Sequence, residues 1–311
     1  MNKVDLHIPF DPYKKAQHYI TGLIHYLVDE FDQQGTAEKL SAKYFNDASS
    51  KYYKMTPAVI LEQWKATGER AIMIGSALDD YVAHVTEPEE QKTSMAQWMK
   101  LVDFTNDEAI YKRTAAWDRY WAALENAGWE MVGREIPLFN TVNGVLIGGR
   151  TDMIIYHKAK NVITIIDWKT ADDIAANRWT KPMHGPNKTL LQDKATMYGL
   201  QVAFYKMALK KILPVDLQNT DIETWIVQVK SDGSVVETKN NISLTDEQLE
   251  ELLTYCVKKQ NEANPPANIN NSVQNTFEIE LCNLIKKYEL DKNYSAEMLT
   301  KFITKTIDIF K

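Results

Sequence analysis

Apolar residues recur at the spacing of amphipathic helices through the first 127 residues, and the spacing then changes to that of strands. Alternating and β-branched runs follow, separated by turn residues, which is typical of a buried sheet. The predicted helices cover about residues 11–48, 57–85 in two pieces, 91–127, 198–213, a helix starting at Thr245, and 277–311. The predicted strands cover about 129–139, 145–157, 161–169, 223–230 and 234–239. This order predicts an α/β fold: a central mixed β-sheet flanked by helices, with helical additions at both ends.

Two turns predict how three of the strands pair. The pair Asn143-Gly144 favours a two-residue type I′ hairpin, and in that register Glu135 lies opposite Asp152. A four-residue loop over 158–161 would then place Asp152 opposite Asp167. Three carboxylates would lie side by side on neighbouring strands, with their Cβ atoms roughly 5 Å apart.

Like charges in such a row destabilise a sheet unless a positive charge lies among them. Lys169 is one candidate, because it follows Asp167 by two residues and points to the same face of the strand. A divalent cation bound through oxygen ligands is the other. The alternative is an ordinary strand end that carries scattered acids.

These residues resemble a known signature. Asp152 followed by Asp167-Trp168-Lys169 is similar to the D…(D/E)xK motif of the PD-(D/E)XK nuclease superfamily. Gln201 and Tyr205 resemble the QxxxY motif of its RecB-like and Cas4-like branch, and Glu135 resembles that branch's upstream acid. The connector before Gln201 resembles that of viral (phage-type) exonucleases, and the resemblance spans about residues 50–212.

The resemblance implies a restriction-endonuclease-like core whose active site lies where the sheet opens beside the Gln201 helix. It implies a Mg²⁺-dependent (or Mn²⁺-dependent) phosphodiesterase, a DNA exonuclease that serves recombination, repair or replication. Two alternatives stay open: a nucleic-acid-binding protein that has lost turnover, and a site-specific or RNA-directed endonuclease. The partners it implies are single-stranded DNA or duplex ends, together with a recombination or replication protein.

The same resemblance implies roles for individual residues. Asp152, Asp167 and the Trp168 carbonyl would bind the metal, and Lys169 would orient the attacking water. Glu135 is a further candidate ligand. Asp79 is another, and it stands where the family's GxxxH motif has a histidine. A carboxylate oxygen could still serve Mg²⁺ there, whereas the alternative for Asp79 is a solvated helix surface.

Nucleic-acid contacts are predicted on the helix after the sheet and on the connector. Tyr198, Gln201 and Tyr205 share one helix face, and they could bind phosphate, sugar or a stacked base. Residues 169–211 carry eight Lys or Arg and three Asp, in a chain whose net charge is −6. This local excess suits a polyanion. The connector residues that we expect to contribute are Arg178, Lys181 and Lys188.

The cysteine content and the apolar runs limit the kinds of protein that the sequence can encode. Two cysteines are too few for a four-cysteine iron–sulfur cluster, so we expect none. The first 15 residues lack the apolar stretch of a secretory leader, and no run approaches the roughly 18 apolar residues of a membrane span. We therefore expect a cytoplasmic protein (in the host cytoplasm if viral) with no membrane contact. The predicted regions are a helical N-terminal region 1–70, a nuclease core 71–245 and a helical C-terminal region 246–311.

Overall fold

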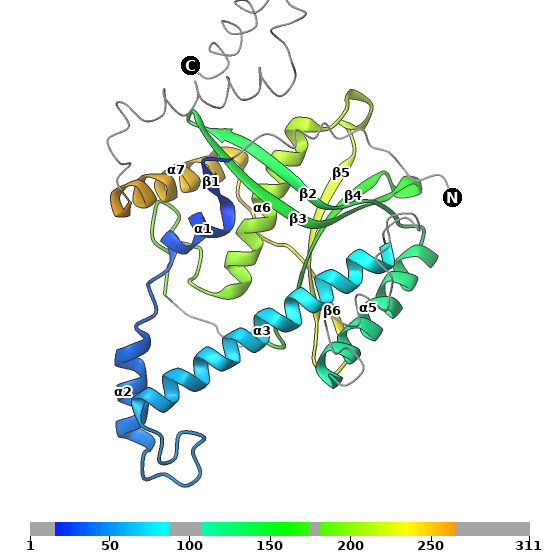
Figure 1. The fold of residues 1–311 in the computed structure, drawn as a ribbon. Coiled ribbons are helices and arrows are strands. Elements are labelled where there is room, and N and C mark those ends of the chain that lie inside the picture. The colour runs from blue at the N-terminus through cyan, green and yellow to red at the C-terminus, as the bar shows by residue number, and fades with distance from the viewer. Residues whose placement is uncertain (1–15, 87–106, 175–180, 265–311) are drawn as a thin grey trace, which may run out of the picture. The chain divides into compact units, whose positions relative to one another are not determined.

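The computed structural model describes residues 16–86, 107–174 and 181–264 (Figure 1). By internal contacts the chain divides into one unit of Met1–Gln260 and a second of Asn261–Lys311, and the description of the second ends at residue 264. The helices predicted over 91–106 and 277–311 lie outside the described residues. The domain boundaries given above remain a prediction.

The central mixed sheet that the sequence predicted forms the centre of the first unit, and it has six strands, one more than the five predicted. The strands are β1 His18–Tyr19, β2 Glu130–Val142, β3 Val145–His157, β4 Val162–Lys169, β5 Asp221–Val229 and β6 Val235–Lys239. They lie in the order β1-β3-β4-β5-β6, and β2 pairs with β3. The pairs β1/β3 and β4/β5 are parallel, whereas β2/β3, β3/β4 and β5/β6 are antiparallel.

Helices cover both faces of this sheet (Figure 1). One core contains buried residues of α1, α6 and α7 together with alternate β4 residues such as Ile163 and Ile165. The other contains buried residues of α3 and α5 together with Ile166 and Trp168. The α-helices are α1 Ile20–Ile24, α2 Gln33–Tyr44, α3 Pro57–Thr86, α5 Glu108–Asn126, α6 Lys194–Ile212 and α7 Asp246–Ala263. Among the described residues, no helix is long and apolar enough to span a membrane.

The predicted strand register is confirmed. Asn143 and Gly144 have φ values of 48° and 80°, as a type I′ turn requires, and the hairpin closes in the predicted register. The next turn uses residues 158–161, and β3 and β4 pair from there to Met153 opposite Ile166. Continued by one residue, these registers place residue 152 opposite residues 135 and 167, although neither pair belongs to the ladders: the β2/β3 pairs pass from Ile136 to Arg134, and the β3/β4 pairs end at Met153.

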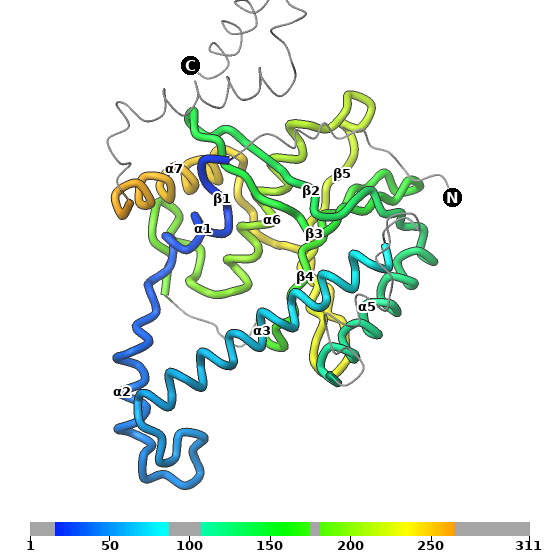
Figure 2. Tube along the Cα trace, in the orientation of Figure 1, coloured from blue at the N-terminus to red at the C-terminus, as the bar shows by residue number. Residues whose placement is uncertain are grey.

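The prediction of a continuous helix over 11–48 is wrong for residues 16–48. Gln17 N donates to Leu146 O at 2.9 Å and Leu146 N donates to the Gln17 side chain at 2.7 Å, so the segment begins as β1 on the edge of β3. Figure 2 traces this path, in which the blue N-terminal segment runs beside green β3. The short helix α1 follows, and α2 starts at its own N-cap, Asp32, which accepts a bond from Gly35 N. Pairing with a distant strand outweighs the helical pattern here.

The division of residues 57–85 into two helices is also wrong. A single helix of 30 residues, α3, starts at Pro57 and continues through Gly68 and Gly75 to Thr86. Thr56 Oγ1 accepts a hydrogen bond from Val59 N at 3.4 Å, so the predicted start is confirmed. Because α3 is continuous, its first turns contact α2 and its last turns contact α5 and the sheet.

Candidate active site

The site begins at a gap along one edge of β3. The other edge of β3 pairs with β2 along its length, so β1 and β4 must share the remaining edge. On that edge β1 pairs with residues 147–148 and β4 with residues 153–157, and no described strand pairs with 149–152. Helix α6 approaches the gap closely, because a Cβ on Gly149 would lie 2.4 Å from Tyr205 Cε1. Asp152 is thus in the part of β3 where the sheet opens.

Two acids and one lysine meet at the end of β4 beside this gap. Asp152 Oδ2 accepts a hydrogen bond from Trp168 N at 2.8 Å, which ties β3 to β4. Lys169 Nζ lies 2.5 Å from Asp167 Oδ2, and the Asp167 side chain is only 1% exposed. Asp152, Asp167 and Lys169 therefore form one charged cluster inside the protein.

The pKa shifts in this cluster indicate that the positive charge of Lys169 does not fully offset the negative charges of the two carboxylates. Burial, and then the neighbouring Asp167, raise the pKa of Asp152 well above its ordinary value. Burial opposes the charge on Lys169, but Asp167 and Asp152 outweigh it, so the pKa of Lys169 is raised. Asp167 Oδ2 is buried and makes no aligned hydrogen bond besides this ion pair. A proton or a further cation would relieve the repulsion between the two carboxylates.

Helix α6 brings the three predicted residues of its inner face to the cluster. Gln201 Nε2 donates to Asp167 Oδ1 at 3.2 Å and to Tyr205 Oη at 2.9 Å. The Lys169 ammonium lies 4.9 Å from the centre of the Tyr198 ring. Tyr205 is 1% exposed, so it supports Gln201 from behind, whereas Tyr198 is only partly buried. Gln201 therefore holds one oxygen of Asp167 while Lys169 faces the other.

Asp79 reaches the same strand end from α3. Trp168 Nε1 donates to Asp79 Oδ1 at 2.6 Å, and the Trp168 ring packs edge-on against Trp117 at 4.8 Å. More than a third of Asp79 stays exposed, but its surroundings bury the carboxyl enough to raise its pKa, which the bond from Trp168 opposes. Trp168 therefore donates its backbone N–H to Asp152 and its indole N–H to Asp79.

Glu135 lies at an irregular point of β2. Its φ of 50° is left-handed, a conformation that residues with a side chain seldom adopt. Its carboxylate pairs with Arg150 at 3.2 Å on the partly exposed surface of the sheet. The structure therefore gives Glu135 an internal partner, as it does Asp79.

The fit to a metal ion rests on Asp152 and Asp167. Among the described residues, no three His, Cys, Asp or Glu side chains gather closely enough to hold an ion. The two carboxylates are nevertheless adjacent and short of positive charge, with Asp167 buried and Asp152 partly buried, and their hard oxygens suit Mg²⁺. The donor set thus fits a divalent ion held by two acids, with remaining positions open to backbone oxygen, water or substrate.

The connector is tied to the segment after α1. Lys181 forms an ion pair with Asp29, and His184 Nε2 lies 2.9 Å from the other Asp29 oxygen. Lys188 Nζ donates to Met183 O at 3.4 Å. Arg178 lies outside the described residues. Sequence reasoning missed Asp29 and His184, and no local signal links residues 155 positions apart.

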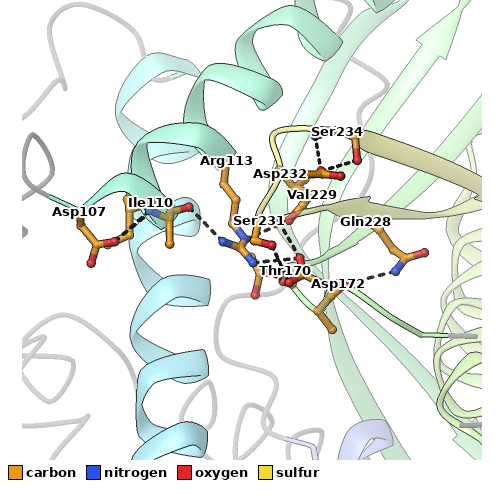
Figure 3. A network of polar contacts seen from close by, with 12 residues as sticks. Asp107, Ile110, Arg113, Thr170, Asp172, Gln228, Val229, Ser231, Asp232 and Ser234 are labelled. Atoms are coloured by element: carbon orange, nitrogen blue, oxygen red, sulfur yellow. Dashed lines mark hydrogen bonds and ion pairs between the residues drawn. The ribbon is translucent and has the colours of Figure 1, made fainter. Parts of the chain in front are cut away.

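Arg113 of α5 is the other residue that the sequence reasoning missed. Its side chain is 5% exposed, and Nη2 donates to Thr170 O at 3.0 Å, directly after Lys169. Nε donates to Val229 O at 3.1 Å at the end of β5. Nη2 also pairs with Asp172 at 3.3 Å, and Asp172 accepts bonds from the Ser231 backbone and hydroxyl (Figure 3). This network fixes the ends of the parallel strands β4 and β5, of which β4 carries Asp167 and Lys169.

Comparison with known proteins gives one family. The model of the PD-(D/E)XK nuclease superfamily matches residues 59–282, which include Asp79, Glu135, Asp152 and Asp167. Among solved structures, a protein from Eubacterium rectale described as a candidate exonuclease is 17% identical with a TM-score of 0.37, covering 76% of this chain and 85% of its own. The protein designated SSO0001 is 14% identical with a TM-score of 0.30, covering 61% and 85%. No curated protein matches the sequence.

Proposed function

Because the chain belongs to the PD-(D/E)XK nuclease superfamily, we propose that it is a metal-dependent deoxyribonuclease that acts as an exonuclease. The observation that carries the proposal is the cluster of buried Asp167 with partly buried Asp152 and Lys169 at the gap in the sheet, with Gln201 bound to Asp167. The Gln201–Tyr205 motif and the connector support a place in the RecB-like and Cas4-like branch, near viral exonucleases. That placement suggests work on DNA ends in recombination, repair or replication.

Asp152 and Asp167 would hold Mg²⁺, or Mn²⁺ in its place, together with the Trp168 carbonyl. Glu135 and Asp79 are the nearby acids that could add oxygen donors. When bound, the ion would lower the pKa of a water and stabilise the charge that builds up on the phosphate. The raised pKa of Asp152 supports this assignment, because a second cation would favour its ionised form.

The other residues of the site would hold the nucleic acid and orient the attacking water. Lys169 would leave its ion pair with Asp167 to face the attacking water and the phosphate, while Gln201 keeps Asp167 Oδ1 in place. Tyr198, beside Lys169, would contact the sugar or base next to the cleaved bond. Tyr205 acts through Gln201. Lys181, Lys188 and Arg178 are proposed contacts to the strand along the connector.

A nucleic-acid-binding protein without turnover is the second candidate. One observation favours it: Asp79 is hydrogen-bonded to Trp168 and Glu135 is paired with Arg150, so only two of the four proposed acids are gathered. An active enzyme on this fold would have to bind its ion with fewer carboxylates, or recruit Asp79 or Glu135 from these partners.

Cleavage of end-labelled linear DNA and circular DNA, in Mg²⁺, Mn²⁺ or EDTA, tests the proposal. We expect the wild type to degrade linear DNA with metal and to spare circular DNA. Asp152→Asn should lose cleavage and keep DNA binding, because it removes charge from the ion site without removing the acceptor for Trp168 N. Asp80→Asn, an exposed acid on α3, is the matched control and should cleave normally.

Each other result has a definite meaning. Equal cutting of circular DNA would replace the exonuclease assignment with an endonuclease. Binding without cleavage in every metal would favour the second candidate. Undiminished cleavage by Asp152→Asn would show that the chemistry lies elsewhere in the protein.

A further inference from the structure

A basic and aromatic surface lies far along the chain from the charged cluster. We call residues 39–55 the arm tip: the second half of α2 and the loop that leads to α3. These 17 residues contain four lysines, three tyrosines, one phenylalanine and a single acid, Asp47, so they carry a charge of +3 in a chain of −6. The charge of the arm tip is therefore opposite to that of the molecule as a whole.

The loop of the arm tip is an ordered structure with its own internal bonds. Lys54 N donates to Phe45 O at 2.9 Å and closes the loop, and Ser41 Oγ on α2 donates to Met55 O at 2.8 Å. Asp47 Oδ1 accepts bonds from Ser49 N and Ser49 Oγ, so the only acid is engaged within the loop. These bonds hold the lysines in place without neutralising them.

Each of three lysines lies over the ring of a neighbouring tyrosine. The ammonium-to-centroid distances are 4.8 Å for Lys43–Tyr44, 4.9 Å for Lys51–Tyr52 and 5.2 Å for Lys54–Tyr53. Among the described residues these lysines make no ion pair, unlike Lys169, Lys181 or Lys211 elsewhere. One of these rings, Tyr53, is 39% exposed, and the neighbouring Phe45 is 40% exposed.

Unpaired ammonium groups beside exposed rings suit one kind of ligand. Phosphates bind lysine by charge, and unpaired bases stack on aromatic side chains, which is how proteins hold single strands without reading sequence. A duplex would offer the phosphates but would keep its bases stacked inside. We propose that the arm tip is a second binding site for single-stranded nucleic acid, apart from the candidate active site.

Helix α3 sets the spacing between the two sites. The arm tip precedes Pro57, the first residue of α3, and Asp79 of the same helix contacts Trp168 at the candidate active site. Twenty-two residues of helix separate them, or about 33 Å at about 1.5 Å per residue. Phe31 before α2 packs on Trp64 of α3 at 5.8 Å, so α2 lies against the first half of that helix (Figure 1). At the duplex spacing of about 3.4 Å per nucleotide, a strand engaging both sites would span about ten nucleotides, and an extended single strand would need fewer.

Binding of fluorescent single-stranded DNA of about 3 and about 30 nucleotides, by anisotropy in EDTA, tests the inference, because the short strand cannot span both sites even when it is extended. The test variant is Lys43→Gln/Lys51→Gln/Lys54→Gln in the full chain. The control removes the same charge elsewhere, as Lys112→Gln/Lys158→Gln/Lys258→Gln. Thermal melting checks that both variants fold like the wild type.

We expect the test variant to bind the long strand at least about tenfold more weakly, while its binding of the short strand changes little. Three lost phosphate contacts should lower the salt slope by about 2, so between 50 and 200 mM salt the wild type should lose roughly 20-fold more affinity than the variant. Tyr53→Leu, which removes the ring and keeps the charge, should weaken long-strand binding about fivefold or more and leave the salt slope unchanged.

The inference depends on the proposed function only for the position of the cleavage site. The second binding site and the nuclease assignment can therefore fail separately. Long-strand affinity and salt slope equal to wild type in the triple variant would overturn the second site and leave a protein partner as the occupant. A loss of affinity matched by the control triple would overturn it as well. If the wild type binds through the arm tip but cleaves nothing, the second site stands and the nuclease assignment fails.

Discussion

Replacing Arg113 by methionine tests whether the network of Figure 3 holds the strand ends in place. Methionine keeps much of the length and apolar stem of arginine but removes the guanidinium. Thr170 O and Val229 O would lose their donors at 3.0 and 3.1 Å, in a place where Arg113 is 5% exposed. Thr170 directly follows Lys169, so the change acts on the strand end that carries the proposed catalytic lysine.

The expected cost follows from these lost bonds. A buried carbonyl left without a donor costs about 1–3 kcal/mol, which applies to Val229 O; Thr170 O, whose bond is only part-buried, costs less, so the two together cost about 2–5 kcal/mol. Asp172 adds little, because its side chain is 53% exposed and it keeps both bonds from Ser231. Removing a buried cation returns part of its desolvation cost. We therefore expect Arg113→Met to lower the free energy of unfolding by about 2–4 kcal/mol.

Urea denaturation followed by tryptophan fluorescence measures this change, because Trp117 and Trp168 lie in the adjacent core. Lys112→Met, at the residue before Arg113 on α5, is the matched control. It removes an exposed ion pair with Glu108, and this should change the free energy of unfolding by no more than about 0.5 kcal/mol. Cleavage by Arg113→Met, assayed where the variant is still folded, should also fall, because Lys169 would lose its fixed position. A loss below about 1 kcal/mol, or one no larger than that of Lys112→Met, would refute the reasoning.

Two further variants test single contacts. Asp79→Asn keeps an oxygen that can accept the bond from Trp168 Nε1, but it removes the negative charge. If Asp79 is a metal ligand, the variant should need a several-fold higher Mg²⁺ concentration for half-maximal cleavage. Superimposable titrations of wild type and variant would exclude the ligand role. The pKa of Asp107 is lowered, chiefly by its bond from Arg70, so its ionised form stabilises the fold above its ordinary pKa of about 3.8 and that stability is lost as pH falls through the lowered value. Asp107→Ala should therefore cost about 1 kcal/mol at pH 7, through the lost N-cap of α5, and less in denaturation at pH 3; an equal cost at both pH values would contradict this.

Short-range signals in the sequence were enough for the strand meander and its register. The Asn143-Gly144 turn requires left-handed backbone, which these two residues tolerate, and one turn determines every later pair of its hairpin. The next turn extended the register to β4, so the opposition of Asp152 and Asp167 could be predicted. The predicted helix start at Thr245 was equally local: Thr245 and Gln248 exchange the two hydrogen bonds of a capping box.

The tertiary structure decided the contacts between residues far apart in the sequence. Gln17 pairs with Leu146 across 129 positions, which turned the start of a predicted helix into a strand. The bond from Trp168 to Asp79 spans 89 positions, and that from Arg113 to Val229 spans 116. Turn and helix signals act over a few residues, because they depend on backbone conformation and the nearest side chains. The packing of the helices on the sheet decides which distant groups meet. In this structure it brings Asp79 to Trp168 and Arg113 to the strand ends.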